Sequence, residues 1–391
     1  MTRTARSEAH LPLADNPAGQ GLMLTTLALL ALGVVMVHSA VASVAKPGPW
    51  YARADLRHTL FAALAVLTMV TLWRLDYHRL AAGRRIPIIP AVLLAVALAA
   101  GALVFVPGLG KAIGGHARWL RFGPAQYAIG FQPSELIKVT LVVFLATWLG
   151  KETTEPRSFL KTFLPAALLI GLCAAVVITQ DFGAAVIIVF AAGATLLLAG
   201  VPWAYLAAMI PPAVAAFYVM VVRDAHRWLR ITAMLDPWSQ ANPSAYQPRQ
   251  SLLAIMTGGW FGKGLGAGMQ KLGYLPEDST DFIFSVYCEE FGFLGAALLV
   301  GLMLMWLWHA RKMVLAAGDH QGRLLAGALG FLVACQAVLH VAVDTAAAPP
   351  TGAAMPFISA GGTALLLLAA AVAMMVSVTA HPPRPAGEMI D

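Results

Sequence analysis

Six ionisable side chains lie within or at the edge of strongly apolar segments, where a charge is costly and usually has a function. Glu135 and Lys138 are three positions apart, so in a helix they share one face and can pair directly. That pair could hold two helices together. Alternatively, the Lys138 ammonium could balance the negative charge of a pyrophosphate group. The six residues are Glu135, Lys138, Asp181, Glu289, Glu290 and Asp344.

The other members of this set also allow a structural interpretation beside a functional one. Asp181 lies in a short break between two apolar segments, where Asp most often caps a helix or stabilises a turn. Glu289 and Glu290 could form an interfacial pair whose carboxylates reach the water. His340 and Asp344 are four positions apart, which permits an ordinary buried hydrogen-bonded pair.

The composition identifies the environment that must hold these groups. The chain has 391 residues, of which 59% are hydrophobic and only 12% are charged, and its mean hydropathy is +0.75. Soluble domains contain roughly 25% charged residues, so these values exclude a soluble globular enzyme and a disordered protein. The net charge of +7 does not indicate a nucleic-acid partner, because the Lys and Arg are scattered between apolar segments. The three cysteines form no CxxC pair and therefore suggest neither a metal site nor a disulfide framework.

Ten segments meet or approach the length of roughly 20 apolar residues that a membrane-spanning helix needs. We therefore predict an all-α integral membrane protein with about ten transmembrane helices. Because several segments are short or contain Pro, Gly or a charge, nine or eleven helices also fit the sequence. The ten segments are about 21–43, 58–73, 86–106, 133–149, 163–179, 183–199, 203–222, 283–308, 323–346 and 354–380.

The distribution of Lys and Arg predicts the orientation of these helices. With the N-terminus in the cytoplasm, the short inner loops and tails carry thirteen Lys and Arg, and the short outer loops carry six. An even number of helices then places the C-terminus in the cytoplasm as well. All six ionisable residues would lie toward the outer face, which predicts a polar cavity that opens to the outer leaflet. The expected organisation is a tail at 1–20, helices one to seven in 21–222, an extracytoplasmic loop at 223–282, helices eight to ten in 283–380, and a tail at 381–391.

The loop at 223–282, between helices seven and eight, is the unusual part of the chain. Loops beyond about 12–15 residues without structure of their own are uncommon and usually functional. This one contains a helix-like piece at 251–257 and a glycine-rich run at 258–266. No strand precedes the glycines, so they are a weak indication of a nucleotide site and more typical of a close backbone approach at the membrane surface.

The loop and three further blocks resemble the SEDS family, which comprises RodA, FtsW and SpoVE, the proteins of cell shape, elongation, division and sporulation. In the loop the resemblance is clearest at LPEDSTDFIF (275–284), and it continues through 289–295. Residues 132–138 resemble the family's QPSE-x-x-K motif, and residues 349–363 resemble its P-x-TG…LPFISYGGS motif. Since the blocks occur in the right order over about 21–380, the chain is identified as a member of this family.

Several positions depart from the family's motifs. Thr179 and Gln180 replace the first two residues of its Q-P-D-[LF]-G motif, Ala360 replaces the Tyr of ISYGG, and Thr363 replaces the final Ser. His340 stands at a position that is often Asn. These changes lie near the predicted cavity, where they could alter lipid contacts or control by a partner. The acidic motif of the loop is unchanged.

The resemblance implies a peptidoglycan glycosyltransferase that polymerises lipid II at the outer face of the bacterial cytoplasmic (inner) membrane. It assigns to Asp281 the role of general base, which takes the proton of the attacking sugar hydroxyl and is typically worth about 10²–10⁴-fold in rate. A divalent cation, Mg²⁺ or Mn²⁺, could help to neutralise the departing undecaprenyl pyrophosphate, although no cluster of ligands in the sequence demonstrates one. The expected substrate-binding residues, with Arg118 and Lys138 first and Lys271 and Arg230 next for the pyrophosphate, are Arg118, Gln132, Ser134, Glu135, Lys138, Arg230, Gln247, Lys271 and Glu277.

Two other classes of function belong to the same resemblance. A lipid II flippase would need polar groups along a full path across the membrane, whereas here they lie toward one side. A non-catalytic scaffold that recruits a class B penicillin-binding protein would gain support if the carboxylate were missing, but Asp281 is present. An active enzyme of this family is expected to work with a class B penicillin-binding protein, a transpeptidase, and with other elongation or division proteins.

Overall fold

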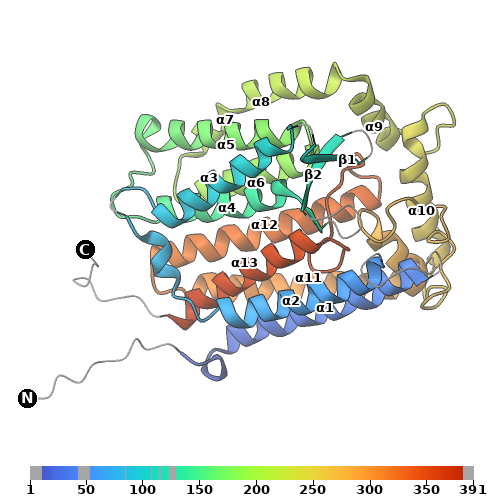
Figure 1. The fold of residues 1–391 in the computed structure, drawn as a ribbon, viewed down its shortest axis with the longest axis horizontal. Coiled ribbons are helices and arrows are strands. Elements are labelled where there is room, and N and C mark those ends of the chain that lie inside the picture. The colour runs from blue at the N-terminus through green and yellow to red at the C-terminus, as the bar shows by residue number, and fades with distance from the viewer. Residues whose placement is uncertain are drawn as a thin grey trace, which may run out of the picture.

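The protein folds into a bundle of long helices, as its apolar segments predict (Figure 1). In a bilayer each main-chain polar group must find a partner within its own segment, and a helix achieves this for a single apolar segment. The computed structural model describes residues 11–42, 53–83, 85–106, 108–113, 116–122 and 129–381.

Each of the ten segments predicted to span the membrane contains helical structure. The long helices are α1 (Pro17–Ala42), α2 (Ala54–Leu72), α3 (Ile88–Leu103), α4 (Pro133–Leu149), α5 (Leu164–Ile178), α6 (Phe182–Leu198), α11 (Ile283–Ala316), α12 (His320–Asp344) and α13 (Gly362–Ala380). The short helices are α7 (Trp203–Ala207), α8 (Ile210–Phe217), α9 (Ala225–Leu235) and α10 (Tyr246–Gly258), with single 3-10 or π turns at Leu13–Asp15, Tyr77–Ala81, Phe159–Phe163, Tyr218–Val222 and Pro243–Ala245.

Within the described residues, seven helical stretches are long and apolar enough to cross a membrane. The apolar helices α3 and α6 are shorter, and α4 has 17 residues with two charges among them. The prediction for the last segment is wrong at its start, because residues 354–361 form an irregular loop and α13 begins only at Gly362. That loop contains Pro356 and a turn, but its residues are mostly apolar, so hydropathy alone does not separate it from the helix that follows.

The helices differ sharply in how much of their surface the bundle covers. The apolar window of α13 is 72% buried, and this helix contacts α1, α2, α4, α11 and α12. Its many Ala residues let neighbouring helices approach closely, as is usual where lipid gives no hydrophobic driving force. In contrast, the stretch 203–222 (α7, α8 and the π turn after them) is only 6% buried and lies along one edge of the bundle (Figure 1). Its bare apolar surface is what a lipid-facing helix requires.

The two described ends of the chain lie together. Leu11 N–H donates to the main-chain oxygen of Ala380 (2.9 Å), which joins the segment before α1 to the end of α13. The helices α9 and α10, which belong to the long loop, lie at the opposite end of the bundle (Figure 1). The described ends of the chain and the long loop thus lie at opposite ends of the bundle, and the side of the membrane that each faces stays a prediction from the Lys and Arg distribution.

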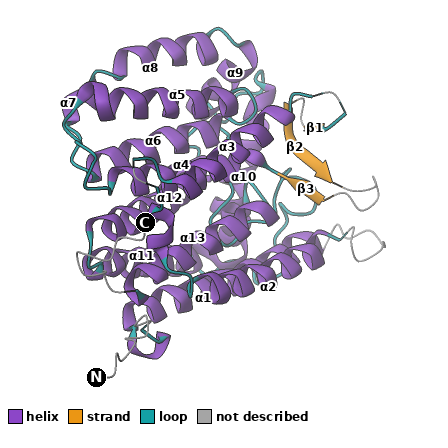
Figure 2. Ribbon diagram, turned by 60° about the vertical axis from the view of Figure 1, so that its left-hand side comes forward, coloured by secondary structure: helices purple, strands orange, loops and turns teal. Residues whose placement is uncertain are grey.

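A small antiparallel sheet between α3 and α4 is the element that the sequence analysis missed. Its strands are β1 (Gly110–Ile113), β2 (His116–Phe122) and β3 (Ile129–Phe131), in the order β1-β2-β3, with Leu120 opposite Phe131. Figure 2 shows the strands at the edge of the helical bundle. The sheet matters for the site because β2 carries Arg118 and β3 runs directly into α4.

The glycine-rich run at 258–266 packs against a break in α11, not against a ligand. Gly292 in α11 has a left-handed backbone (φ 65°, ψ −165°), which only glycine adopts easily, and the break leaves nearby carbonyls free to accept hydrogen bonds. Lys263 N–H and Gly264 N–H donate to the main-chain oxygens of Glu289 and Glu290, each at 3.0 Å. The predicted close backbone approach is therefore correct in kind, but the partner is α11.

Candidate functional site

Asp281 is held in a tight turn that ends where α11 begins. The turn starts at Glu277, which has a positive φ of 57°, and its main-chain oxygen accepts the N–H groups of Thr280 (3.2 Å), Asp281 (3.0 Å) and Phe282 (3.2 Å). Three N–H groups that share the main-chain oxygen of Glu277 hold residues 277–282 in a compact turn. The carboxylate of Asp281 is consequently projected from a compact, well-defined loop and not from a mobile strand of chain.

The side chains of Arg118 and Asp281 face the same small space beside Gly352. A methyl group placed on Gly352 would lie 2.8 Å from Arg118 Nη1 and 3.6 Å from Asp281 Oδ2. Any larger side chain at Gly352 would therefore displace the guanidinium. Because Gly352 has no side chain, the guanidinium of Arg118 and the carboxylate of Asp281 can both approach it from different elements.

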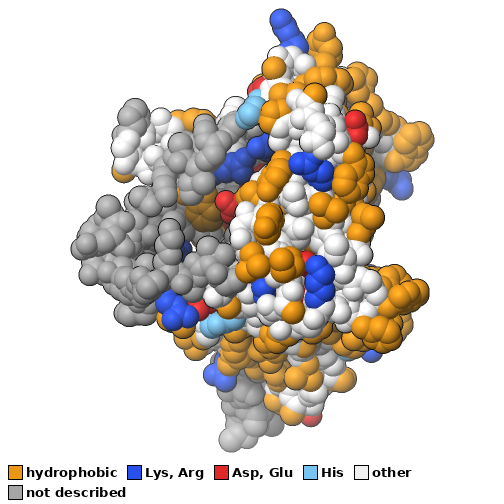
Figure 3. All heavy atoms as spheres, turned by 90° about the vertical axis from the view of Figure 1, so that its right-hand side faces the viewer, with side chains coloured by type: hydrophobic (Ala, Val, Ile, Leu, Met, Phe, Trp, Pro, Cys, Tyr) orange, Lys and Arg blue, Asp and Glu red, His pale blue; other side chains and the backbone are white. Residues whose placement is uncertain are grey.

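A cavity of about 70 Å³ adjoins this spot. It lies between the hairpin that joins α5 to α6, the helix α9, and the segment 349–352. Arg118, Arg227 and Arg230 contribute three positive charges to its wall, and Asp181 and Asp224 contribute two negative ones. Figure 3 shows basic and acidic side chains gathered among hydrophobic ones on the face at this end of the bundle. A lining of this kind suits an anionic group attached to an apolar molecule.

Hydrogen bonds to main-chain oxygens hold two of the arginines in the wall. Arg227 Nη2 donates to the main-chain oxygen of Ile178 (3.1 Å), at the end of α5. Arg230 Nη1 donates weakly to that of Pro350 (3.4 Å). Burial, followed by the positive charge of Arg118, lowers the pKa of Arg230 from its usual value. A buried cation repelled by its neighbours is stabilised by the arrival of an anion.

The pKa of Asp281 lies far above that of an ordinary aspartate. Burial of the carboxylate, together with the nearby negative charge of Glu277, raises this pKa to about 7, against the opposing influence of Arg118. The side chain nevertheless keeps some contact with solvent. An acid with a pKa near the working pH is well matched to accept and release a proton. Burial also raises the pKa of the neighbouring Asp278, to about 6.

Asp181 has the structural role that its position predicts, and it also lines the cavity. Its Oδ1 accepts Ala184 N–H (3.0 Å), which caps α6. Its Oδ2 accepts a hydrogen bond from Gln132 Nε2 (3.1 Å), so Gln132 reaches the edge of the site through Asp181. Of the six ionisable residues that predicted a common polar cavity, Asp181 is the one that lines it.

Lys138 lies outside this cavity. Its Nζ is 2.7 Å from Glu135 Oε1 and donates to Gln336 Oε1 (3.1 Å) on α12. The side chains of Lys138 and Glu135 are buried. The geometry therefore supports the structural interpretation of the pair, a tie between α4 and α12. The neighbouring Ser134 is also buried and lines no part of the cavity.

Lys271, expected near the pyrophosphate, is instead part of the anchor between the long loop and α11. Its Nζ lies 2.5 Å from Glu290 Oε1 and donates to Ser39 (2.9 Å) on α1. In the same way, Glu289 pairs with Lys263 at 2.6 Å. The prediction that the two glutamates form an interfacial pair reaching the water is wrong, since both are buried and paired with lysines of the loop. The hydropathy of α11 does not reveal that the loop folds back onto it.

The two other predicted binding residues also lie outside the cavity lining. Gln247 is half-buried on α10, and Glu277 is exposed, with its carboxylate accepting the hydroxyl of Thr280 (3.0 Å). Glu277 acts on the site through its turn and its charge. In contrast, Arg227 lines the cavity and was not predicted. The sequence could have revealed Arg227, because it is three positions from Arg230 and shares one face of α9 with it.

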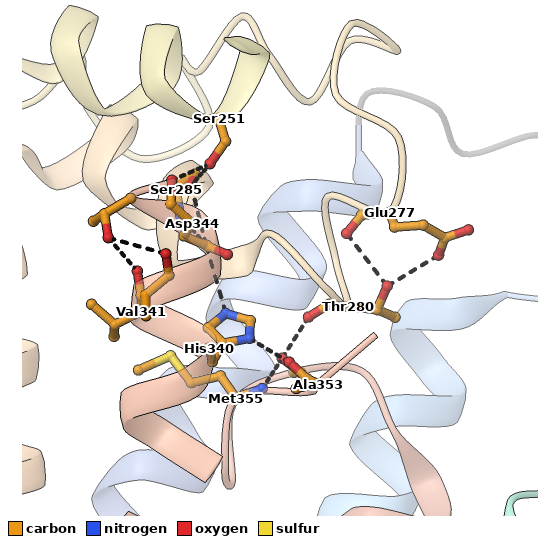
Figure 4. A network of polar contacts seen from close by, with 12 residues as sticks. Ser251, Glu277, Thr280, Ser285, His340, Val341, Asp344, Ala353 and Met355 are labelled. Atoms are coloured by element: carbon orange, nitrogen blue, oxygen red, sulfur yellow. Dashed lines mark hydrogen bonds and ion pairs between the residues drawn. The ribbon is translucent and has the colours of Figure 1, made fainter. Parts of the chain in front are cut away.

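A second polar network joins the first turn of α11 to the end of α12 (Figure 4). Asp344, at the end of α12, accepts hydrogen bonds from the N–H (2.9 Å) and the hydroxyl (3.1 Å) of Ser285. His340 lies one turn earlier, with Nε2 3.6 Å from Asp344 Oδ2 and Nδ1 2.7 Å from the main-chain oxygen of Ala353. Both side chains are buried, as predicted, but no hydrogen bond joins them, because 3.6 Å is too long and His340 Nε2 has no hydrogen-bond partner. Among the described residues, no three His, Cys, Asp or Glu are placed to hold a metal ion together.

The sequence and the fold both have close counterparts among known proteins. A profile of the family described as "Cell cycle protein", which covers FtsW, RodA and SpoVE, matches residues 20–383. The chain is 35% identical to a probable peptidoglycan glycosyltransferase FtsW of Geobacter sp. (strain M18), over 92% of this chain and 95% of that protein. It is also 35% identical to the probable FtsW of Thioalkalivibrio sulfidiphilus, over 96% of this chain and 93% of that protein.

Solved structures of similar fold extend the comparison. A chain from a peptidoglycan synthase complex that coordinates polymerisation and crosslinking superposes with a TM-score of 0.73 at 26% identity, covering 92% of this chain and 97% of that one. The rod shape determining protein RodA of Thermus thermophilus superposes with a TM-score of 0.63 at 25% identity, covering 92% and 95%. These similarities cover more than nine tenths of this chain and of each solved chain.

Proposed function

Because this chain belongs to the FtsW, RodA and SpoVE family of cell cycle proteins, we propose that it polymerises lipid II with Asp281 as the general base. The protein is a multi-pass protein of the bacterial inner membrane and a peptidoglycan glycosyltransferase. The observation that carries the assignment is the position of Asp281 Oδ2 beside Arg118 at the edge of a basic cavity, with a pKa of about 7.

In the proposed reaction, the ionised carboxylate of Asp281 takes the proton from a sugar hydroxyl. The hydroxyl oxygen forms a bond to the anomeric carbon of a second lipid II, and the bond from that carbon to the undecaprenyl pyrophosphate breaks. A β-linked product from an α-linked donor requires inversion, which a single displacement provides. No covalent glycosyl-enzyme is needed, so one carboxylate acting as a base is sufficient.

The leaving pyrophosphate develops negative charge, and the cavity supplies the positive charge to meet it. We assign this role to Arg118, Arg230 and Arg227, whose guanidinium groups can make charge-assisted, bidentate hydrogen bonds to phosphate oxygens. Main-chain oxygens already orient the last two, so little side-chain freedom remains to be lost when the anion binds. Lys138 and Lys271 act as parts of the scaffold in this proposal.

The test of the base is the variant Asp281→Asn, which removes the proton acceptor and keeps the size of the side chain. Purified protein with its partner transpeptidase would be given labelled lipid II, and the glycan strands separated on a gel. We expect polymerisation to fall by at least about 100-fold, the lower end of the contribution of a general base. The matched control is Asp278→Asn, which removes a carboxylate three positions away in the same loop.

The outcome that contradicts the assignment is a normal ladder of glycan strands from Asp281→Asn. Two other functions would then have to be considered, and they differ in a second assay. A flippase would move lipid II across liposomes equally well with and without Asp281. A scaffold would show neither polymerisation nor movement of lipid, and would retain only its partner.

We also propose that the partner is a class B penicillin-binding protein. The synthase complex that contains a chain of similar fold couples polymerisation to crosslinking, and a transpeptidase performs the second reaction. Co-purification from the cells that produce this protein tests the proposal: a class B penicillin-binding protein should be recovered with it, and its consistent absence would contradict the proposal.

A further inference from the structure

The first turn of α11 lacks a cap of its own. Phe282 occupies the N-cap position and has no side-chain acceptor, so the N–H groups at the start of α11 need partners from elsewhere. This helix start matters because Asp281 directly precedes Phe282. Any movement of the first turn of α11 therefore moves the carboxylate of Asp281.

Asp344 supplies the missing cap from another helix. Its Oδ2 accepts the N–H of Ser285 (2.9 Å), the third residue of α11, and the Ser285 hydroxyl (3.1 Å). Both Asp344 and Ser285 are buried completely. The Ser285 N–H also contacts the main-chain oxygen of Phe282 (3.1 Å), so Asp344 adds a second, shorter bond at this helix start. A side-chain acceptor of this kind is normally provided by the residue that precedes the helix. Here α12 provides it across the bundle.

Ser251 on α10 strengthens this contact. Its Oγ lies 2.5 Å from Ser285 Oγ and donates to the main-chain oxygen of Asp344 (2.6 Å). The side chain of His340, through the main-chain oxygen of Ala353, joins the same end of α12 to the segment that follows it. The helices α10, α11 and α12 and the segment that contains Ala353 thus meet at this buried network (Figure 4).

A second contact holds the chain on the other side of Asp281. The hydroxyl of Ser359 donates to the main-chain oxygen of Thr280 (2.7 Å), and Ala360 N–H donates to that of Ser279 (2.9 Å). The residues before Asp281 are therefore fixed by the segment 355–360, and those after it by Asp344. The backbone of Asp281 is clamped from both directions.

Backbone strain is concentrated in the same segments. The described residues other than glycine that have a positive φ are Glu277 (57°), Ala346 (54°) and Phe357 (65°). Glu277 begins the turn of Asp281, Ala346 follows Asp344, and Phe357 precedes the residues that bind Ser279 and Thr280. Such conformations persist only where the surrounding contacts enforce them, and they concentrate at functional sites.

We propose that Asp344 is a positioning residue for the reaction, which fixes the first turn of α11 and thereby the place of Asp281. This proposal rests on the proposed role of Asp281. Asp344 touches neither the cavity nor the reacting groups, since its contacts are Ser285, Ser251 and His340. It acts on the reaction by holding the base.

The test compares Asp344→Ala, which deletes the acceptor, with Asp344→Asn, whose amide oxygen can still accept Ser285 N–H. We expect Asp344→Ala to lower kcat about 100-fold, the loss that a displacement of about 1 Å can cause, with KM for lipid II changed less than about threefold. Asp344→Asn should recover most of the lost kcat. In a background of Asp281→Asn, Asp344→Ala should lower the residual rate less than about threefold, because both changes act through one group.

The matched control is Asp319→Ala, which also deletes a helix-capping carboxylate. Asp319 caps α12 through Gly322 N–H (3.0 Å) at the other end of the bundle. Thermal unfolding of the purified variants shows whether each is folded. Should Asp344→Ala not accumulate, Asp344→Ser, whose hydroxyl is too short to reach Ser285, takes its place.

Three results would overturn the proposal: a folded Asp344→Ala with the kcat of the natural protein, an Asp344→Asn variant as inactive as Asp344→Ala, or an Asp319→Ala variant with an equal loss of kcat. A rise in KM with unchanged kcat would also overturn it, because Asp344 would then serve binding. An active Asp281→Asn variant would refute the proposed function itself. An inactive Asp281→Asn beside a fully active Asp344→Ala would refute only the positioning role.

Discussion

The raised pKa of Asp281 predicts how the polymerisation rate depends on pH. A general base works in its ionised form, so the rate should rise with pH through the pKa and then level off. For a pKa of about 7, the ionised fraction is roughly one tenth at pH 6 and roughly nine tenths at pH 8. The value of kcat should therefore increase about tenfold over this range. An aspartate with the ordinary pKa of 3.8 would be ionised throughout, and kcat would not change.

The electrostatic surroundings of Asp281 indicate how the midpoint of this pH profile can be shifted. The negative charge of Glu277 contributes to the raised pKa of Asp281, second to burial. The variant Glu277→Gln removes that charge, so the midpoint of the pH profile should shift to lower pH. Glu277 is exposed, and salt screens interactions between exposed charges, so the shift should be largest at low ionic strength.

The assay is the initial rate of glycan formation from saturating labelled lipid II, measured from pH 5.5 to 8.5 at low and high salt. A control variant, Glu155→Gln, removes an exposed carboxylate at the other end of α4 and should leave the midpoint in place. A kcat that is constant between pH 6 and 8 would refute the assignment of this pKa to the base. A midpoint that does not respond to Glu277→Gln at low salt would refute the electrostatic explanation.

Three further predictions follow from the site. Burial raises the pKa of Asp281 from 3.8 to about 7, so ionisation of Asp281 destabilises the fold increasingly as pH rises between these two values. The variant Asp281→Asn removes this cost, and at pH 8 it should increase the free energy of unfolding by up to about 4 kcal/mol. Thermal unfolding in detergent measures the change. Gly352→Ala should lower the polymerisation rate in the gel assay about tenfold or more, because its methyl group would lie 2.8 Å from the guanidinium of Arg118. The control Gly361→Ala, whose methyl group would lie 3.7 Å from its nearest neighbour, should have a nearly unchanged rate. Lys138→Met should destabilise the protein by about 3–5 kcal/mol by leaving Glu135 buried and unpaired, and addition of Glu135→Leu should restore most of the loss in the unfolding temperature.

The helical elements of this fold were predictable because hydropathy is a local property. Apolar residues in continuous runs must be helical in a bilayer, and each of the ten predicted runs contains a helix. The sheet at Gly110–Phe122 and Ile129–Phe131 was not predicted, since its strands are short and lie between charged and glycine residues that resemble an ordinary loop. The division between the loop at 354–361 and α13 was hidden because both parts are apolar.

The site was predictable only in part. Asp281, Arg118 and Arg230 were expected from the resemblance to the family; the two arginines line one cavity, and Asp281 lies beside its edge at Gly352. Lys138 and Lys271 were expected there for the same reason, but Lys138 pairs with Glu135 and Lys271 with Glu290, and each also donates to a polar group far away in sequence. The distant groups are Gln336, 198 positions from Lys138, and Ser39, 232 positions from Lys271. No local pattern reveals such partners.

Composition, hydropathy and motif order are properties of the linear chain, and they were enough to predict a helical membrane protein with an acidic motif in a long loop. Which charges are available to a substrate depends on how the helices pack. Lys138 pairs with Glu135, Lys271 with Glu290, and Lys263 with Glu289. In contrast, Arg118 and Arg230 line a cavity, and Asp281 faces Arg118 beside Gly352, where no side chain fills the space. The physical reason is that a buried charge must find a partner, and the fold alone determines whether that partner is part of the protein or must come from the substrate.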